Sequence, residues 1–284
     1  MQLFRLSDGI VLQNQGANYL LNLRWDTLVN RDGLYSYLSN VLPDLSILNK
    51  DEAARLINTK LQPPIGNQEV WAAGVTYLRS REARMEESAG SGAADLYDRV
   101  YAAERPELFF KSMPHRVAGH NQHVYIRRDS TWNVPEPELA LFINSKGSIQ
   151  GYTVANDMSS RSIEGENALY LPQAKIFERS AALGPCLYVP ERPIPAETAI
   201  KMSIHRDNRE VYRDETSIDR MKRSFAELAG YLYRECDFPY GCFLMTGTCL
   251  VPPNDFTLHE GDVVSINIDG IGRLVNTVSY KPGI

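Results

Sequence analysis

The chain has 284 residues, of which 43% are hydrophobic and 23% charged, as is usual for a globular protein. Its net charge of −5 gives no general attraction to nucleic acid or to an anionic membrane. No apolar stretch approaches the roughly 18 residues that cross a bilayer, and the first residues lack the pattern of a signal peptide. The four cysteines form no Cys-x-x-Cys pair. We therefore expect a cytoplasmic protein with reduced thiols and with no nucleic-acid or membrane partner.

Two prolines and a glycine within residues 61–67 predict a connector, because prolines remove backbone donors and glycine loosens the chain. The segment before it mixes strands and helices and contains no dense cluster of chemical groups. We predict a small N-terminal accessory domain or lid over residues 1–66 and a main domain over residues 67–284.

The main domain begins with an apolar strand at residues 69–75. Charged helical stretches follow at residues 80–88 and 95–105, on either side of a Gly-Ser break. Two interpretations are open for them: a mobile surface element, or simply an exposed pair of helices.

Strand patterns dominate after Pro106. Residues 124–126 and 139–143 are apolar runs of strand length, and Asp269-Gly270 predicts a hairpin within residues 261–278. One amphipathic helix interrupts them, with a possible cap at Ser217 and apolar residues at spacings of three and four (Ile218, Met221, Phe225, Leu228 and Leu232). Strands that do not alternate regularly with helices predict a β-rich α+β fold.

Two glutamates flank a proline at the start of the strand that contains residues 139–143. Residues two apart in a strand point to one face, so Glu136 and Glu138 project side by side, away from the apolar residues. Residues 144–148 form a turn, and pairing of residue 144 with residue 149 places Glu136 opposite Asp157. The hairpin therefore predicts that three carboxylates converge at its open end.

Like charges held this close repel, unless bound protons, basic partners or a cation offset the repulsion. Three oxygen ligands with open positions suit Mg²⁺, with Mn²⁺ or Ca²⁺ as substitutes. The spacing alone leaves two interpretations open: a metal site, or three solvated acids on a surface hairpin. The loop histidines His115, His120 and His123 have no neighbouring cysteine, and we expect them to have structural or substrate-contact roles rather than to bind metal.

The chain contains Glu136-Pro137-Glu138-Leu139, Asn156-Asp157, Lys175 and Thr246-Gly247-Thr248 in this order. Together, these elements resemble the fumarylacetoacetate hydrolase family over roughly residues 70–280. The resemblance implies a distorted mixed β-roll or β-sandwich core and Mg²⁺ on the three carboxylates. It also implies a small-molecule 2-oxo acid as substrate and a homodimer or homotetramer.

Within the family, residues 80–84, 104–111, 161–167 and 170–175 resemble the branch that dehydrates 2-keto-3-deoxy sugar acids. The hydrolases have Asn-Tyr and then a histidine that helps to activate water, whereas this chain has Thr76-Tyr77 and then Ser80. A serine without an adjacent base cannot take a proton from water at neutral pH. Elimination of water needs no attacking water in its first step, so this departure favours the dehydratases.

The resemblance implies a metal-dependent hydro-lyase of pentose catabolism. It would convert 2-keto-3-deoxy-D-arabinonate to 2,5-dioxopentanoate through a metal-bound enolate. The alternatives are a hydrolase of C–C bonds in acylpyruvates or diketo acids, and an oxaloacetate decarboxylase of the same family. A binding protein without activity on this fold is a further alternative.

Two residues are assigned catalytic roles. The charge balance around three carboxylates and a dication favours Lys175 as the group that stabilises the enolate oxygen or transfers a proton, and a surface lysine is the alternative. Glu107 lies where a helix leads into a strand, in a stretch that matches the dehydratases, and is assigned as acid or base at C3 or C4.

Substrate contacts are assigned to Gly247 and Thr248, at the substrate carboxylate, and to Arg81 and Arg84, which either clamp the substrate or are solvated. Three charged residues shortly after Asp157 either support the site or line the loop (Arg161, Glu164 and Glu166).

Overall fold

A computed structural model describes residues 1–79 and 94–283 of the chain. The helix predicted at residues 80–88 and the break after it lie outside the described residues. Within them, the strands form one large mixed sheet, a five-stranded sheet and a two-stranded sheet. This arrangement confirms the predicted β-rich α+β class.

The large sheet has the strand order β4-β3-β2-β1-β13-β11-β10-β16-β5-β6, with β7 beside β13. Strand β1 pairs with β13, so the sheet continues across the boundary predicted at residue 66, and a separate N-terminal domain stays a prediction. The strands are β1 (Gln2–Leu6), β2 (Gly9–Asn14), β3 (Ala17–Leu21), β4 (Ile47–Leu48), β5 (Glu69–Gly74), β6 (Glu107–Ser112), β7 (Val117–Ala118), β10 (Pro137–Ile143), β11 (Ile149–Asp157), β13 (Ala181–Tyr188) and β16 (Cys242–Met245).

The five-stranded sheet has the order β15-β14-β17-β18-β8, and β9 pairs with β12 apart from it. Strands β17 and β18 are the hairpin predicted from Asp269-Gly270, with Ile268 opposite Gly272. The strands are β8 (Gln122–Ile126), β9 (Asn133–Val134), β12 (Ser159–Ser160), β14 (Ala199–Arg206), β15 (Arg209–Ser217), β17 (Val263–Ile268) and β18 (Gly272–Tyr280).

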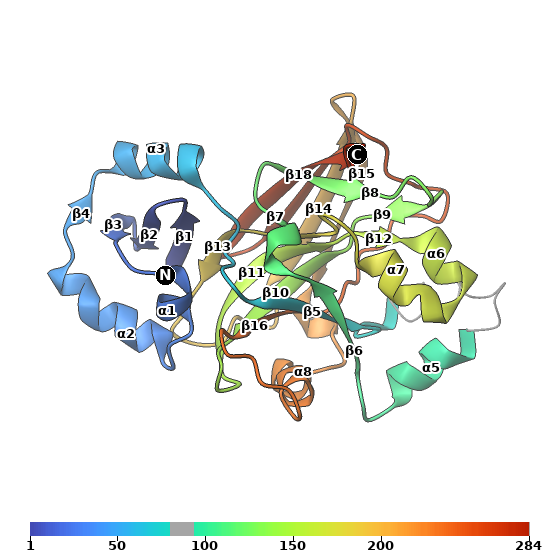
Figure 1. Ribbon diagram of the computed structural model, residues 1–284, viewed down its shortest axis with the longest axis horizontal. Helices are drawn as coiled ribbons and strands as arrows, with labels where there is room; N and C mark the ends of the chain where they lie inside the picture. The colour runs from blue at the N-terminus through green and yellow to red at the C-terminus, as the bar shows by residue number, and fades with distance from the viewer. Residues whose placement is uncertain (80–93, 284) are drawn as a thin grey trace.

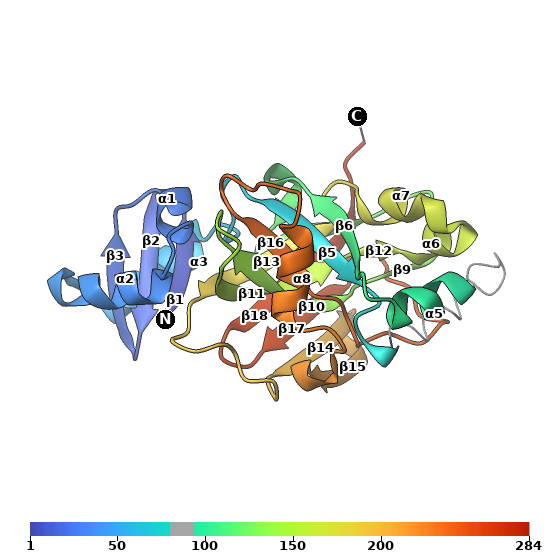
Figure 2. The same ribbon diagram turned by 90° about the horizontal axis from the view of Figure 1, so that it is seen from below.

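Helices lie around the sheets. Figure 1 shows α1, α2 and α3 with β1–β4 at one end of the molecule and α5, α6 and α7 at the other. Figure 2, a view from below, shows α8 in front of the core. The helices are α1 (Trp25–Val29), α2 (Leu34–Val41), α3 (Lys50–Lys60), α5 (Ala94–Ala102), α6 (Arg161–Glu166), α7 (Leu171–Lys175) and α8 (Phe225–Leu232), with short 3-10 turns η1 (Leu42–Asp44), η2 (Pro114–Arg116), η3 (Ala168–Tyr170) and η4 (Ile218–Arg220).

The helix predicted from Ser217 onward begins later than expected. Strand β15 extends to Ser217, the turn η4 follows, and α8 begins only at Phe225. The Ser224 hydroxyl accepts the N–H of Glu227 and caps the helix. Ser217 is therefore wrong as the cap, because extended pairing with β14 holds it in the sheet.

Both faces of β10 are buried, in two different apolar clusters. Leu139 and Leu141 pack into the first cluster, between the large sheet and the five-stranded sheet, with Ile200, Val264 and Leu274. Ala140 and Phe142, which alternate with them along β10, pack on the opposite face with Ala155, Leu183 and residues of the N-terminal segment (Leu28, Leu34 and Leu38). This alternation confirms the period of two predicted for the strand and places the glutamates on the second face.

No helix among the described residues is long and apolar enough to cross a membrane. All four cysteines are free thiols, as expected, with Cys186 and Cys242 buried and Cys236 exposed.

Candidate metal centre and active site

The hairpin β10–β11 brings the three predicted carboxylates together. Its register places Glu138 opposite Ala155, and the Asp157 N–H donates to the Glu136 carbonyl at 2.9 Å. The predicted register is therefore confirmed along the strands. Near the turn it shifts by a bulge, which pairs Ile143 with Ile149.

One carboxylate oxygen from each acid lies within 4.8 Å of the others. The exposed fractions are 4% for Glu136, 2% for Glu138 and 1% for Asp157. The alternative of three solvated acids on a surface hairpin is therefore wrong. Buried carboxylates at this spacing need compensating charge.

Glu138 is the carboxylate on which burial acts most strongly. Burial and the charges of Asp157 and Glu136 raise the pKa of Glu138 well above its usual value. Its Oε2 accepts the Gly247 N–H at 2.6 Å. Gly247 has a φ of +95°, and a side chain there would meet the Thr76 hydroxyl at 2.0 Å, so the position requires glycine.

Lys175, at the end of α7, is fully buried among the acids, and the alternative of a surface lysine is wrong. Its Nζ lies 2.5 Å from Glu136 Oε2, 3.3 Å from Asp157 Oδ2 and 3.4 Å from Glu164 Oε1. Lys175 therefore borders the space between the acids, as the charge balance predicted.

A second buried lysine, Lys111 on β6, was not predicted from the sequence. Its Nζ lies 2.5 Å from Asp157 Oδ1 and donates to the carbonyls of Lys175 at 2.5 Å and Met158 at 3.0 Å. Burial lowers the pKa of Lys111, and the Asp157 carboxylate beside it opposes that effect. The one available signal is a lysine at the end of an apolar strand pattern, where a charge needs a buried partner.

Two residues that follow Asp157 complete the cluster. Arg161 Nη2 lies 3.1 Å from Glu136 Oε1, and Glu164 Oε1 accepts the Ser159 hydroxyl at 2.8 Å. Both are buried and support the site, whereas Glu166 is exposed.

The charges of the cluster nearly balance. When all are ionised, four carboxylates (Glu136, Glu138, Asp157 and Glu164) face three cations (Lys111, Lys175 and Arg161), which leaves a net charge of −1. A bound dication would bring the total to +1, and a monoanionic 2-oxo acid would bring it to zero. The donor set therefore suits a hard divalent cation with oxygen ligands, together with an anionic substrate.

A hollow of ≈20 Å³ lies between the acids, lined also by Gly74, Lys175, Gly247 and Thr248. This volume suits one ion or one water molecule. Thr248 therefore lies beside the acids. The Gly247 N–H points at Glu138, and the substrate contacts of both residues stay predictions.

Glu107 lies beside this hollow. It begins β6 opposite Gly74, and a side chain at Gly74 would meet the Glu107 carboxylate at 2.0 Å. Arg81 and Arg84 lie outside the described residues. Among residues 1–79 and 94–283, the acid cluster contains no histidine, and His120 Nδ1 instead accepts the Val275 N–H at 3.2 Å.

The fold and the acid cluster together define the class of protein. The chain belongs to the fumarylacetoacetate hydrolase family, since the sequence model described as fumarylacetoacetate (FAA) hydrolase C-terminal matches residues 70–279.

Two relatives are dehydratases by name. A probable 2-keto-3-deoxyxylonate dehydratase of Haloferax volcanii is 48% identical over 217 residues, covering 76% of this chain and 74% of the relative. The 2-dehydro-3-deoxy-D-arabinonate dehydratase of Saccharolobus solfataricus is 39% identical over 224 residues, covering 78% of this chain and 75% of the relative.

Solved structures agree with these relatives. A crystal form of 2-keto-3-deoxyarabinonate dehydratase is 33% identical, with a TM-score of 0.89 over 100% of both chains. A 2-keto-3-deoxy-D-arabinonate dehydratase complexed with magnesium and 2,5-dioxopentanoate is 32% identical, with a TM-score of 0.86 over 100% of both chains.

Proposed function

We infer that this protein is a Mg²⁺-dependent dehydratase that converts 2-keto-3-deoxy-D-arabinonate to 2,5-dioxopentanoate. The observation that carries this conclusion is the buried cluster of three carboxylates with Lys175, on a chain whose relatives are dehydratases of this substrate class. We propose that Glu136, Glu138 and Asp157 hold the ion.

The two substrates named for the relatives describe one compound when both belong to the D series. Arabinonate and xylonate differ only at C2 and C3, and a 2-keto-3-deoxy acid has no stereocentre at either carbon. The C4 centre remains and is shared. The two relatives therefore support a single substrate for this chain.

The reaction removes one proton from C3 and the hydroxyl from C4, and releases water. A C3=C4 double bond forms, and a proton then moves from C5 to C3. The resulting C4–C5 enol becomes the aldehyde by taking a proton at C4 and releasing the proton of its C5 hydroxyl. A bound divalent ion supplies Lewis acidity, which polarises the C2 ketone and acidifies the C3 hydrogens.

The residues of the chain supply positive charge and proton transfer. We assign to Lys175 the stabilisation of the C2 oxygen as negative charge grows there, because its ammonium borders the hollow. We assign to Glu107 the exchange of protons at C3 or at the departing C4 hydroxyl, because its carboxylate lies against Gly74 at the edge of the hollow. Thr248 and Gly247 are proposed to bind the substrate carboxylate, and Arg81 and Arg84 to contact the rest of the substrate.

The test is an assay with 2-keto-3-deoxy-D-arabinonate in Mg²⁺ and in chelator, with the aldehyde product measured directly. We expect turnover that needs the ion, that Lys175→Met abolishes and that Lys146→Met, at an exposed site, leaves unchanged. Acylpyruvates and oxaloacetate test the alternatives. Fast turnover of an acylpyruvate, with none of the keto-deoxy acid, would overturn the proposal in favour of a C–C hydrolase.

We also propose that the enzyme acts in cytoplasmic pentose catabolism as a homodimer or homotetramer, without nucleic-acid or membrane partners. The pentose-derived substrates named for the relatives support the place in pentose catabolism. The net charge of −5 supports the absence of nucleic-acid and membrane partners. Size-exclusion chromatography with light scattering measures the molar mass of the protein in solution. A monomer at assay concentration would contradict the proposed oligomer.

A further inference from the structure

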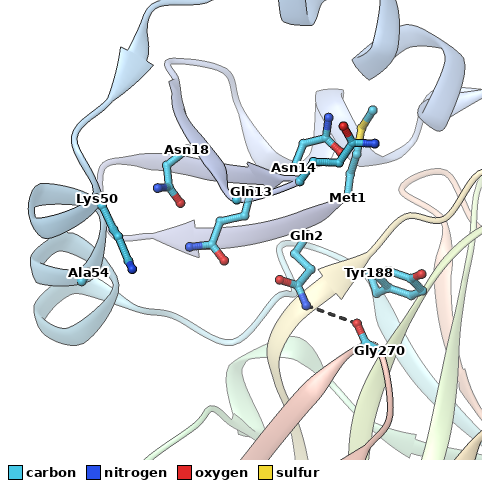
Figure 3. Close-up of a pocket in the computed structure, with 11 residues that line it drawn as sticks. Met1, Gln2, Gln13, Asn14, Asn18, Lys50, Ala54, Tyr188 and Gly270 are labelled. Carbon is cyan, nitrogen blue, oxygen red and sulfur yellow. Dashed lines mark hydrogen bonds between the residues drawn. The ribbon is translucent and has the colours of Figure 1, made fainter.

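A second hollow, of ≈420 Å³, lies where the N-terminal strands meet the core, and none of its lining residues belongs to the metal centre. Figure 3 shows this hollow with strands β1–β3 on one side, the start of α3 on another and Gly270 across from them. Its polar lining consists mainly of carboxamides, with one lysine and one tyrosine (Gln2, Gln13, Asn14, Asn18, Lys50 and Tyr188).

Three of the carboxamides form a row across neighbouring strands. The register places Gln2 opposite Gln13, and Gln13 opposite Asn18. Side chains at directly opposite positions project from one face of a sheet, and Figure 3 shows these amides facing the same space. The row therefore presents several hydrogen-bond donors and acceptors side by side.

Asn18 is the most informative member of the row. Only 6% of the residue is exposed, and its amide makes no hydrogen bond within the described part of the chain. The Gln13 amide also has no partner there, whereas Gln2 donates to the carbonyls of Gly270 and Ile271 at 3.2 and 3.1 Å. Neither the Asn18 amide nor the Gln13 amide is among the fully enclosed polar groups without a partner, so both open onto the hollow, where water or a ligand can meet them.

Lys50 gives the hollow a positive charge. It is the exposed first residue of α3 and lines the hollow. It has no ion pair among residues 1–79 and 94–283, and no aspartate or glutamate lines the hollow. A locally positive site in a protein with a net charge of −5 favours an anionic ligand.

We propose that this hollow binds a hydroxylated monocarboxylate, such as a sugar acid, at a site separate from the metal centre. Lys50 pairs with the carboxylate, the amides of Gln13 and Asn18 exchange hydrogen bonds with hydroxyl groups, and the Tyr188 ring covers the C–H face of the carbon chain. The proposed function enters only in the choice of pentonates as probes, because such acids belong to the substrate class.

The test is calorimetric titration of the full chain with D-arabinonate, which lacks the 2-oxo group of the substrate. The titration is made in chelator with the Glu138→Gln variant, so that the metal centre does not contribute. We expect saturable binding that Lys50→Met weakens about tenfold or more, as for loss of a charge-assisted hydrogen bond. Asn18→Ala should weaken it as well, and Lys146→Met, at an exposed residue that does not line the hollow, should not.

Two further ligands separate the contribution of the carboxylate to binding from that of the hydroxyl groups. D-arabinitol has the hydroxyls without the carboxylate, and butyrate has the carboxylate without hydroxyls, and each should bind much more weakly than D-arabinonate. The proposal is overturned if D-arabinonate shows no saturable binding, or if Lys50→Met and Asn18→Ala leave its affinity unchanged. Neither result bears on the dehydratase activity, which is assayed separately with Mg²⁺ and the keto-deoxy acid.

Discussion

Each oxygen of Asp157 has a lysine as its neighbour. Lys111 binds Oδ1 at 2.5 Å, and Lys175 lies 3.3 Å from Oδ2. Lys111 also binds the carbonyl of Lys175, so a single ammonium group fixes both a candidate metal ligand and the backbone of the candidate catalytic lysine.

Replacement of Lys111 by methionine tests this arrangement. The variant is unbranched and nearly as long, but it removes the buried ammonium that pairs with Asp157 and donates to the carbonyls of Met158 and Lys175. We expect urea unfolding to show a loss of about 3–5 kcal/mol, as for a broken buried ion pair. In the wild type, the exposed Lys146 Nζ lies 3.8 Å from Asp32, so Lys146→Met should change the free energy of unfolding by less than about 1 kcal/mol. A similar small change in both variants would contradict a positioning role for Lys111.

Glu138→Gln should have opposite effects on stability and on metal binding. The pKa of Glu138 is raised in the folded protein, so its stabilising effect is present at acid pH and is lost as the pH rises through that pKa. At neutral pH, the neutral amide should therefore stabilise the metal-free protein by on the order of 1–3 kcal/mol. We expect Mg²⁺ to raise the melting temperature of the wild type, and the same change should abolish that rise.

Thermal melts of both proteins, in chelator and in Mg²⁺ across a series of pH values, measure these effects. The matched control is Glu166→Gln, because Glu166 is exposed near the site. A Glu138→Gln variant that melts lower than the wild type in chelator at neutral pH would show that Glu138 is not under charge repulsion.

At the scale of elements, the β10–β11 hairpin shows what could be predicted from the sequence. The period of a strand and a short turn fix which residues are opposite, so the convergence of Glu136, Glu138 and Asp157 follows from local geometry. Lys111 could not be found in this way. It belongs to β6, which is four strands away from β11, the strand that ends at Asp157, so only the curvature of the sheet brings its side chain to Asp157.

The helix near residue 217 shows the opposite case, where a local pattern was wrong. The apolar spacing from Ile218 to Leu232 suits one helix, but pairing with β14 keeps the chain extended as far as Ser217. Ser224 then provides a second capping residue, nearer to the apolar face that α8 buries. Tertiary pairing therefore decided where the helix begins.

The turn at Gly247 connects strand β16 to the acid cluster, and Gly247→Ala tests it. The added methyl group would lie 2.0 Å from the Thr76 hydroxyl and 3.1 Å from the Ala73 carbonyl, at a φ of +95°. Gly261 is the matched control, because it has a φ of +90° and nothing within 4 Å of a methyl group. Gly261→Ala should lower the free energy of unfolding by about 1–2 kcal/mol, because alanine disfavours the left-handed backbone.

Gly247→Ala should cost about 1–3 kcal/mol more than this control, because of the overpacking. It should also weaken Mg²⁺ binding, since it moves the N–H that holds Glu138 at 2.6 Å. Chemical unfolding and calorimetric titration with Mg²⁺ measure the two effects. Equal costs for both alanine variants, with unchanged Mg²⁺ affinity, would show that the close approach to Thr76 has no role at the site.

At the scale of the whole molecule, the N-terminal segment and the core share one sheet and two apolar clusters. Strand β1 pairs with β13, and Phe4 and Leu6 pack into the cluster between the large sheet and the five-stranded sheet. On the other face, Leu183 and Leu187 of β13 pack with residues of the N-terminal segment. This shared packing favours a single cooperative unit over two that unfold independently.

Scanning calorimetry of the full chain should therefore show one unfolding transition, with equal calorimetric and van't Hoff enthalpies for the folded assembly. Removal of residues 1–66 should uncover the β1 edge of β13 together with Leu183 and Leu187, and the shortened chain should aggregate rather than melt cooperatively. Two separate transitions, or a soluble and cooperatively folded 67–284 fragment, would instead establish the boundary at residue 66 as that of an independent domain.

The second hollow lies at the junction between the N-terminal strands and the core, so its ligand should stabilise the whole unit. If D-arabinonate binds there, it should raise the midpoint temperature of the single transition, and Lys50→Met should remove that rise.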